Sequence, residues 1–242
     1  LLHNLKVLIQ YLLGVKMFNK NGYKVVKNVI DKPTLDLIYE YYKLKVENNE
    51  FELDTGQVNG TITMYGDTLG DALLRWTLSY AEDVVGEKLY PCYTFMRIYH
   101  NNDVLEPHCD RPSCEFSATL PIQFDKKWPI LMRKHDFEKY GQDYWTPATE
   151  TEPDNSNLDE ITSVSLNRGD ILFYEGTKMN HWREPFRGNE CVQLFIHYVR
   201  KNGEYSDFKY DRRKNLGLPS VGENTIDCLL YTSDAADERL RV

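Results

Sequence analysis

The chain has 242 residues, of which 41% are hydrophobic, and a formal net charge of −8 at pH 7. This length is sufficient for one domain with a sizeable apolar core, and the acidic balance without basic runs argues against a general binder of nucleic acid or anionic membranes. The longest apolar stretch, around residues 8–15, is too short to span a membrane, and five scattered cysteines without a CxxC pair favour reduced thiols in the cytoplasm over a disulfide framework.

The first 16 residues precede Met17 and are expected to be a non-native or accessory leader. An amphipathic helix is the alternative, because leucines recur at helical spacing over residues 2–12. We expect the folded domain to occupy residues 17–227.

Two helices are predicted in the first third of this domain. In the segment Asp31–Asn48, Pro33 suits the first turn of a helix. The apolar side chains that recur there at helical spacing are Leu35, Ile38, Tyr39 and Tyr42. A second helix is expected from Asp67, which can cap its first turn, to about Gly86.

From Leu89 onward the apolar runs are short, β-branched or aromatic, and separated by turn residues, which is typical of strands. The predicted strands are Tyr93–Tyr99, Phe116–Phe124, Pro129–Met132, Ile161–Leu166, Asp170–Tyr174 and Cys191–Arg200. Helices followed by many short strands imply an α+β fold, with N-terminal helices buttressing a jelly roll, or double-stranded β-helix. Its core is expected over residues 89–200.

Two segments are expected to stand apart from this core. Residues 133–160 are polar, acidic and contain two prolines, so they read as a surface insertion and a candidate lid over a cleft. The stretch Cys228–Glu238, CLLYTSDAADE, is what results from translating a widely used transposase sequencing adapter in one frame. We therefore expect residues 228–242 to be adapter read-through in an environmental, metagenomic-type sequence, without packing or function.

His108-Cys109-Asp110 is a His-x-Asp tripeptide that follows the predicted strand Tyr93–Tyr99. In an extended segment, residues i and i+2 point the same way, so the imidazole and the carboxylate can converge on one ion while Cys109 faces away. His181 is the best third ligand, because a turn after the preceding strand could bring it back over the sheet. Two histidines and one carboxylate leave three positions open, which suits Fe(II) that binds a co-substrate together with O2. The other histidines are expected to be surface or core residues: His3, His100, His135 and His197.

A family resemblance rests on two longer segments. Arg97–Arg111, RIYHNNDVLEPHCDR, is similar to an Arg-x-Tyr, spacer, His-x-Asp-Arg signature. Leu166–Val199 is similar to a Gly-Asp turn, a Leu-Phe strand, a distal histidine and a final core strand. Residues 93–200 thus closely resemble the 2-oxoglutarate/Fe(II)-dependent oxygenases of the prolyl 4-hydroxylase-like kind, and residues 17–200 resemble them loosely.

The resemblance implies that His108, Asp110 and His181 hold the metal, and that Tyr99 lines the 2-oxoglutarate pocket. An ordinary strand aromatic is the alternative for Tyr99. The expected cofactors are Fe(II) and 2-oxoglutarate, with ascorbate as a candidate reductant.

The chain departs from the family's usual pattern at the residue that pairs with the distal carboxylate of 2-oxoglutarate. Such hydroxylases usually place an Arg or Lys nine or ten residues after the distal histidine, where this chain has Glu190 and Cys191. The nearest basic residues are Arg183 and Arg187, and Arg187 is the first choice because a guanidinium can bind a carboxylate through two hydrogen bonds. A solvated turn residue is the alternative for Arg187. Two further candidates lie on strands: Gln193 and Arg97.

The function implied by the resemblance is a dioxygenase that uses O2 to hydroxylate a peptidyl or small-molecule substrate. Neither nucleic acid nor a membrane is an expected partner. Two alternatives from other classes remain. One is a non-catalytic jelly-roll binding or structural module in which His108 and Asp110 are incidental. The other is a cupin-type metalloenzyme independent of 2-oxoglutarate, which the lack of a basic residue at the usual spacing favours.

Overall fold

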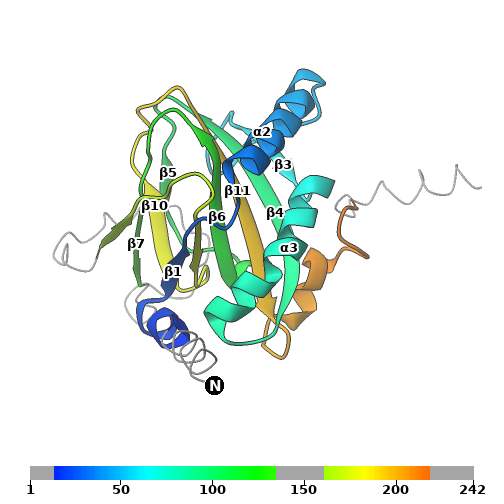
Figure 1. Cartoon of the computed structure of the whole chain (residues 1–242), viewed down its shortest axis with the longest axis vertical. Helices are drawn as coiled ribbons and strands as arrows, with labels where there is room; N and C mark the ends of the chain where they lie inside the picture. The colour runs from blue at the N-terminus through cyan, green and yellow to red at the C-terminus, as the bar shows by residue number, and fades with distance from the viewer. Residues whose placement is uncertain (1–13, 135–160, 219–242) are drawn as a thin grey trace, which may run out of the picture.

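A computed structural model describes residues 14–134 and 161–218 of the chain (Figure 1). The tail at 228–242, most of the leader and most of the 133–160 insertion lie outside these ranges. Residues 14–21 are helical across the expected start of the domain, and Phe18 packs on Phe116 with ring centroids 6.0 Å apart. None of the helices in the described ranges is long and apolar enough to cross a bilayer.

Helices α2 (Lys32–Glu47) and α3 (Thr68–Val85) lie where the sequence predicts them. The side chains of Asp31 and Asp67 accept hydrogen bonds from backbone N–H groups of the first turn, which satisfies donors that a helix leaves unpaired. Gly86 ends α3 at φ 82°, a left-handed conformation that glycine adopts without a steric penalty. Local capping chemistry therefore sets the start of both helices and the end of α3.

The strands form two antiparallel sheets that face each other as a jelly roll. The larger sheet has the order β1-β9-β6-β11-β4-β3-β2 and the smaller sheet the order β5-β10-β7-β8. The strands of the larger sheet are β1 (Tyr23–Val26), β9 (Ile171–Tyr174), β6 (Phe116–Phe124), β11 (Glu190–Arg200), β4 (Leu89–His100), β3 (Ile62–Tyr65) and β2 (Glu52–Leu53). Those of the smaller sheet are β5 (Leu105–His108), β10 (Met179–Arg183), β7 (Ile130–Lys134) and β8 (Thr162–Val164).

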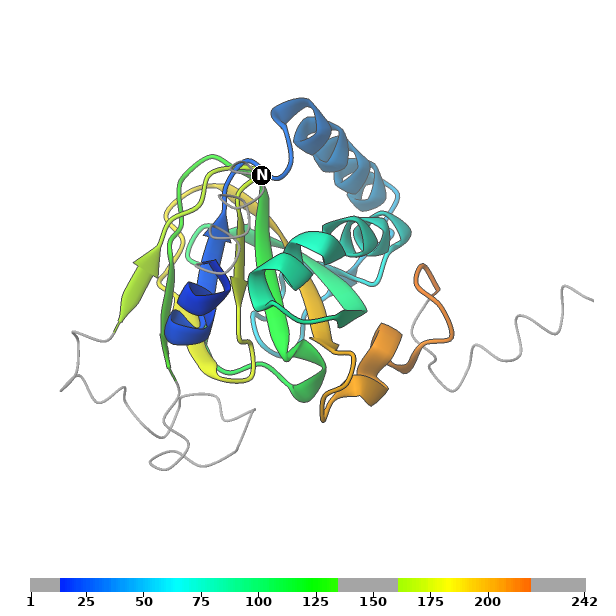
Figure 2. The same ribbon diagram turned by 60° about the horizontal axis from the view of Figure 1, so that its bottom comes forward.

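Alternation along the central strands separates the apolar core from the interior of the jelly roll. Met96 and Ile98 of β4, with Leu194 of β11, belong to the cluster that packs under α2 and α3 (Figure 2). The residues between them point the other way, because successive side chains of a strand alternate. Arg97 and Phe195 accordingly line a cavity between the two sheets.

All six predicted strands are present, and five strands are additional: β1, β2 and β3 in the larger sheet, and β5 and β10 in the smaller sheet. A turn at residues 175–178 reverses the chain before β10. The strands β5 and β10 lack a recognisable apolar alternation. The inward residues of β10, for example, include His181 and Arg183. Their interior face is polar, so hydrophobic patterning alone does not predict them.

A C-terminal segment beyond the predicted core packs against the metal-motif side of the barrel. The helical turns η3 (Ser206–Arg212) contain Asp211, whose carboxylate accepts hydrogen bonds from Arg111 at 2.7 and 3.1 Å. Arg213 pairs with the buried Asp71 of α3 at 2.7 Å. This segment therefore connects α3 to the residue that follows Asp110.

Candidate metal centre

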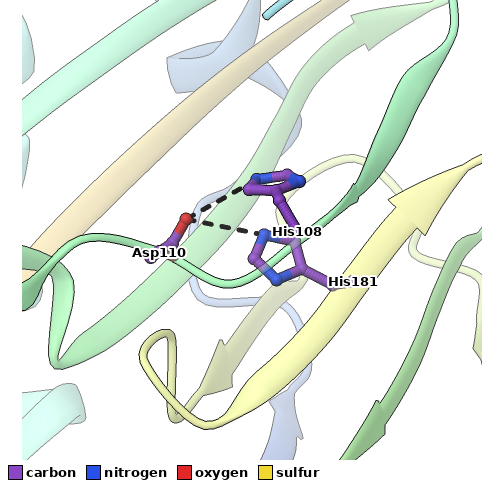
Figure 3. A group of neighbouring side chains, drawn as sticks. All are labelled: His108, Asp110 and His181. Atoms are coloured by element: carbon purple, nitrogen blue, oxygen red, sulfur yellow. Dashed lines mark ion pairs between the residues drawn. The ribbon is translucent and has the colours of Figure 1, made fainter. Parts of the chain in front are cut away.

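The structure brings the three predicted ligands together between β5 and β10 (Figure 3). His181 and His108 are cross-strand partners, and Asp110 follows two residues after the end of β5. Oδ1 of Asp110 lies 3.7 Å from Nε2 of His108 and 3.6 Å from Nε2 of His181. The three ligand atoms lie within 4.8 Å of one another, so one small ion could contact all of them.

Backbone hydrogen bonds fix the orientation and the tautomer of both imidazoles. Nδ1 of His108 lies 2.7 Å from the carbonyl of Glu106, and Nδ1 of His181 lies 2.9 Å from the carbonyl of Met179. A carbonyl only accepts, so each Nδ1 must carry the proton, and each Nε2 keeps its lone pair for the centre. The amide nitrogen of Gln57 donates to this lone pair of His108 at 2.7 Å, which agrees with the same tautomer.

Burial makes the centre receptive to a cation. It lowers the pKa of His108 to about 4, with a further contribution from His181, and lowers the pKa of His181 to about 4. Burial also raises the pKa of Asp110. Both imidazoles are therefore neutral near pH 7, while a positive ion would stabilise the buried carboxylate. This donor set fits a divalent transition metal.

Asp110 is held from behind by groups that local sequence patterns do not reveal. Ser117 donates a hydrogen bond to Oδ2 at 2.5 Å, and the N–H of Asp110 donates to the carbonyl of Gly176 at 2.9 Å. A Cβ at Gly176 would lie 2.6 Å from Oδ2 of Asp110 and 2.2 Å from the carbonyl oxygen of Cys114. Only a glycine permits this close approach.

A cavity of about 400 Å³ opens beside the three ligands. Tyr93, Phe95 and Phe195 supply an aromatic wall, and Arg111 and Glu106 add charge. His197, expected to be a surface or core residue, is buried and also lines this cavity. So does Cys109, which alternation predicts to face away from the ligands. The size and apolar walls of the cavity suit a small organic ligand or one side chain of a larger one.

The residues predicted to bind the co-substrate are placed in different surroundings. Arg97 is buried and already pairs with Asp54 at 2.6 Å. Gln193 accepts a hydrogen bond from Thr119 at 3.1 Å within the barrel. Tyr99 is fully buried.

Arg187 does not line the cavity. It is exposed and donates to the side chain of Asn102 at 2.6 Å.

Arg183, the other basic residue close to His181, is buried, whereas Arg187 is exposed. Arg183 is 2% exposed, its guanidinium lies 5.0 Å from the centre of the Trp128 ring, and it donates to the backbone carbonyl of Trp128. It forms no ion pair with any acidic residue of the described ranges, and its Nε has no hydrogen-bond partner there. A buried guanidinium without an anion is costly, so an anionic ligand would be stabilised beside it.

Arg183 lies near the position where the family resemblance predicts a basic residue. It contributes with Cys191 and Gln193 to a small space of about 10 Å³, separate from the main cavity. Cys191 is one of the two positions where a basic residue was expected, and it pairs across the strands with Tyr99. The positive charge therefore reaches this part of the barrel from β10 instead of β11.

No protein-family model and no curated protein matches the chain. Solved structures do match it. SnoN, an epimerase from nogalamycin biosynthesis solved with Fe3+, alpha-ketoglutarate and nogalamycin RO, is 14% identical with a TM-score of 0.63, over 88% of this chain and 92% of that one. A Pseudomonas putida prolyl-4-hydroxylase is 12% identical with a TM-score of 0.55, over 78% and 98%.

A third similar structure is HygX from Streptomyces hygroscopicus, solved with nickel, 2-oxoglutarate and hygromycin B. It is 14% identical with a TM-score of 0.56, over 78% of this chain and 87% of that one. At such low identities the likeness concerns the fold alone. The predicted α+β jelly roll is confirmed.

Proposed function

We propose that this protein is an Fe(II)- and 2-oxoglutarate-dependent dioxygenase that hydroxylates a peptidyl or small-molecule substrate. The observation that carries the proposal is the convergence of His108, Asp110 and His181 beside a cavity of about 400 Å³ in a jelly roll. Solved structures with this fold include proteins described with iron or nickel and with 2-oxoglutarate bound.

Fe(II) would be held by Nε2 of both histidines and by Oδ1 of Asp110. A set of two imidazoles and one carboxylate leaves open positions on the metal, which a chelating co-substrate and O2 require. When bound, the iron with 2-oxoglutarate and O2 supplies the oxidant, while 2-oxoglutarate is converted to succinate and CO2. Ascorbate is the proposed reductant for iron that has become oxidised.

We assign the distal carboxylate of 2-oxoglutarate to Arg183, in place of Arg187. The support is the burial of Arg183, its lack of an acidic partner in the described ranges and its position two residues beyond His181. Tyr99 packs on Trp128, which also contacts Arg183, so its hydroxyl is a second candidate donor. Binding there requires the small space beside Arg183 to join the main cavity.

The protein's own residues orient the metal ligands and enclose the site. The hydrogen bonds from both Nδ1 atoms fix the imidazole rings before any metal arrives. The aromatic wall of Tyr93, Phe95 and Phe195 would limit the access of water to the centre once a substrate fills the cavity. These side chains would also contact the substrate, and they favour one with an apolar or planar portion.

An anaerobic titration tests the proposal. The full chain is titrated with Fe(II) and then with 2-oxoglutarate, and the visible charge-transfer band of the chelate is recorded. We expect the band to appear in the wild type and to be absent in His181→Ala. Iron binding without a band would favour a 2-oxoglutarate-independent metalloenzyme, and the absence of iron binding would favour a non-catalytic jelly-roll module.

A further inference from the structure

The carboxylate of Asp110 has two oxygen atoms with different surroundings. Oδ1 faces the Nε2 atoms of His108 and His181. Oδ2 points away from them and accepts a hydrogen bond from Ser117 at 2.5 Å. Ser117 Oγ in turn lies 3.0 Å from Nδ1 of His197. A short chain of hydrogen bonds thus leads from the far oxygen of Asp110 into the larger sheet.

The direction of these hydrogen bonds follows from the number of protons. Ser117 has one hydroxyl proton, and the carboxylate of Asp110 only accepts, so this proton lies between Oγ and Oδ2. His197 must therefore supply the proton in its contact with Ser117, which makes Nδ1 its donor. In this way His197 orients the hydroxyl of Ser117 toward Asp110 and away from the competing carbonyl of Cys114 at 3.3 Å.

The surrounding structure holds this pair rigidly. Ser117 and His197 are cross-strand partners on β6 and β11, at the centre of the larger sheet. Both are buried, and the imidazole of His197 stacks on Tyr93 with ring centroids 4.4 Å apart. The donor to Oδ2 is thus placed by the sheet itself, whereas Asp110 lies in a loop outside any strand.

We propose that Ser117 and His197 are positioning residues that keep Asp110 a one-oxygen ligand of the metal. This inference rests on the proposed function. A carboxylate free to turn can bind a metal through both oxygens and so occupy one more coordination position. The hydrogen bond on Oδ2 opposes that rotation, and the position stays available to the co-substrate or O2.

The test uses Co(II), which reports ligand geometry by its visible absorption and needs no 2-oxoglutarate. We expect Ser117→Ala to bind Co(II) about tenfold more weakly, or worse, as is usual when a partner of a metal ligand is removed. Its Co(II) spectrum should also change. Ser117→Thr keeps the hydroxyl and should restore both properties. His197→Phe keeps an aromatic ring against Tyr93 but loses the N–H donor to Ser117. If Ser117→Ala does not fold, the same measurements on His197→Phe test the proposal.

Thr77→Ala is the matched control. Thr77 is equally buried, and its hydroxyl bonds to Tyr198 at 2.7 Å on the helix side of the larger sheet. Its loss should leave the Co(II) affinity and spectrum unchanged, which separates a general loss of stability from an effect on Asp110.

Three results are decisive against one or both proposals. Wild-type affinity and spectrum in folded Ser117→Ala and His197→Phe would overturn the positioning role alone. Two Co(II) ions per chain would also overturn it, because Asp110, Cys114 and His197 could then form a second site. A wild-type chain that binds no Co(II) would overturn the metal centre itself.

Discussion

Arg183 lies two residues beyond His181 on β10, so both side chains point from the same strand into the interior of the jelly roll. The candidate metal centre and the positive charge without an acidic partner in the described ranges therefore share one strand. A ligand that chelates the metal and carries a second anionic group a few bonds away would satisfy both. This relationship is the basis for assigning the distal carboxylate of 2-oxoglutarate to Arg183.

Replacing Arg183 by Gln should weaken 2-oxoglutarate binding while Fe(II) or Co(II) binding persists. Losing a buried, charge-assisted contact costs about 2–5 kcal/mol, which corresponds to at least about 30-fold in affinity. The same change should leave the ligand-free protein as stable or more stable, because it removes a buried unpaired charge. Calorimetric titration and chemical denaturation measure the two effects.

Arg187→Gln is the control for this prediction, since Arg187 is exposed and bonds to Asn102. It should leave the affinity for 2-oxoglutarate unchanged. If Arg187→Gln abolishes co-substrate binding and Arg183→Gln does not, the assignment is reversed.

Gly176→Ala should damage the metal centre by a steric effect. The added Cβ would lie 2.6 Å from Oδ2 of Asp110 and 2.2 Å from a backbone carbonyl, so the loop that carries Asp110 must move. We expect a loss of Co(II) affinity of about tenfold or more, by the same reasoning as for other groups that orient a ligand. Calorimetry or the Co(II) absorption measures it.

Gly60→Ala serves as the comparison for Gly176→Ala. Gly60 has φ 84°, and a Cβ there would meet nothing within 4 Å. It should cost only the backbone strain of about 1 kcal/mol in the free energy of unfolding and leave metal affinity unchanged. Equal losses of affinity in the two variants would contradict a local effect at Asp110.

The metal-free protein should lose stability as the pH falls from about 6.5 to about 4. Burial lowers the pKa of both His108 and His181 from 6.5 to about 4, so the unfolded chain binds more protons than the folded chain in this window. The free energy of unfolding therefore rises with pH there and levels off above about 6.5. The raised pKa of Asp110 acts in the opposite direction.

The variant His181→Gln measures the part of this pH dependence that comes from His181. It should reduce the slope of unfolding free energy against pH by up to about 1.4 kcal/mol per pH unit inside the window. Urea denaturation at several pH values, in the presence of a chelator, gives the slope. An unchanged slope would mean that His181 is not held neutral by burial.

Much of the architecture can be predicted from local sequence. Asp31 and Asp67 cap helices that begin at the next residue, because a side chain that bonds to the first turn needs only short-range geometry. The change from helical to strand-like patterning after Leu89 indicates an α+β fold for the same reason. The spacing of His108 and Asp110 likewise identifies two candidate ligands from neighbouring residues, although Asp110 itself lies in a loop beyond β5.

The surroundings of those side chains depend on contacts between distant parts of the chain. Ser117 and His197 meet Asp110 only because β6 and β11 pair in one register, and a shift of one residue between the two strands would place their side chains on opposite faces of the sheet. Whether Arg183 or Arg187 is buried depends on where β10 ends and the following turn emerges. The sequence by itself determined the helices, the strand-rich class and the candidate ligands, because each follows from neighbours along the chain. Only the tertiary structure decided which charge is buried and what holds the carboxylate, because sheet register and burial are properties of the whole packed chain.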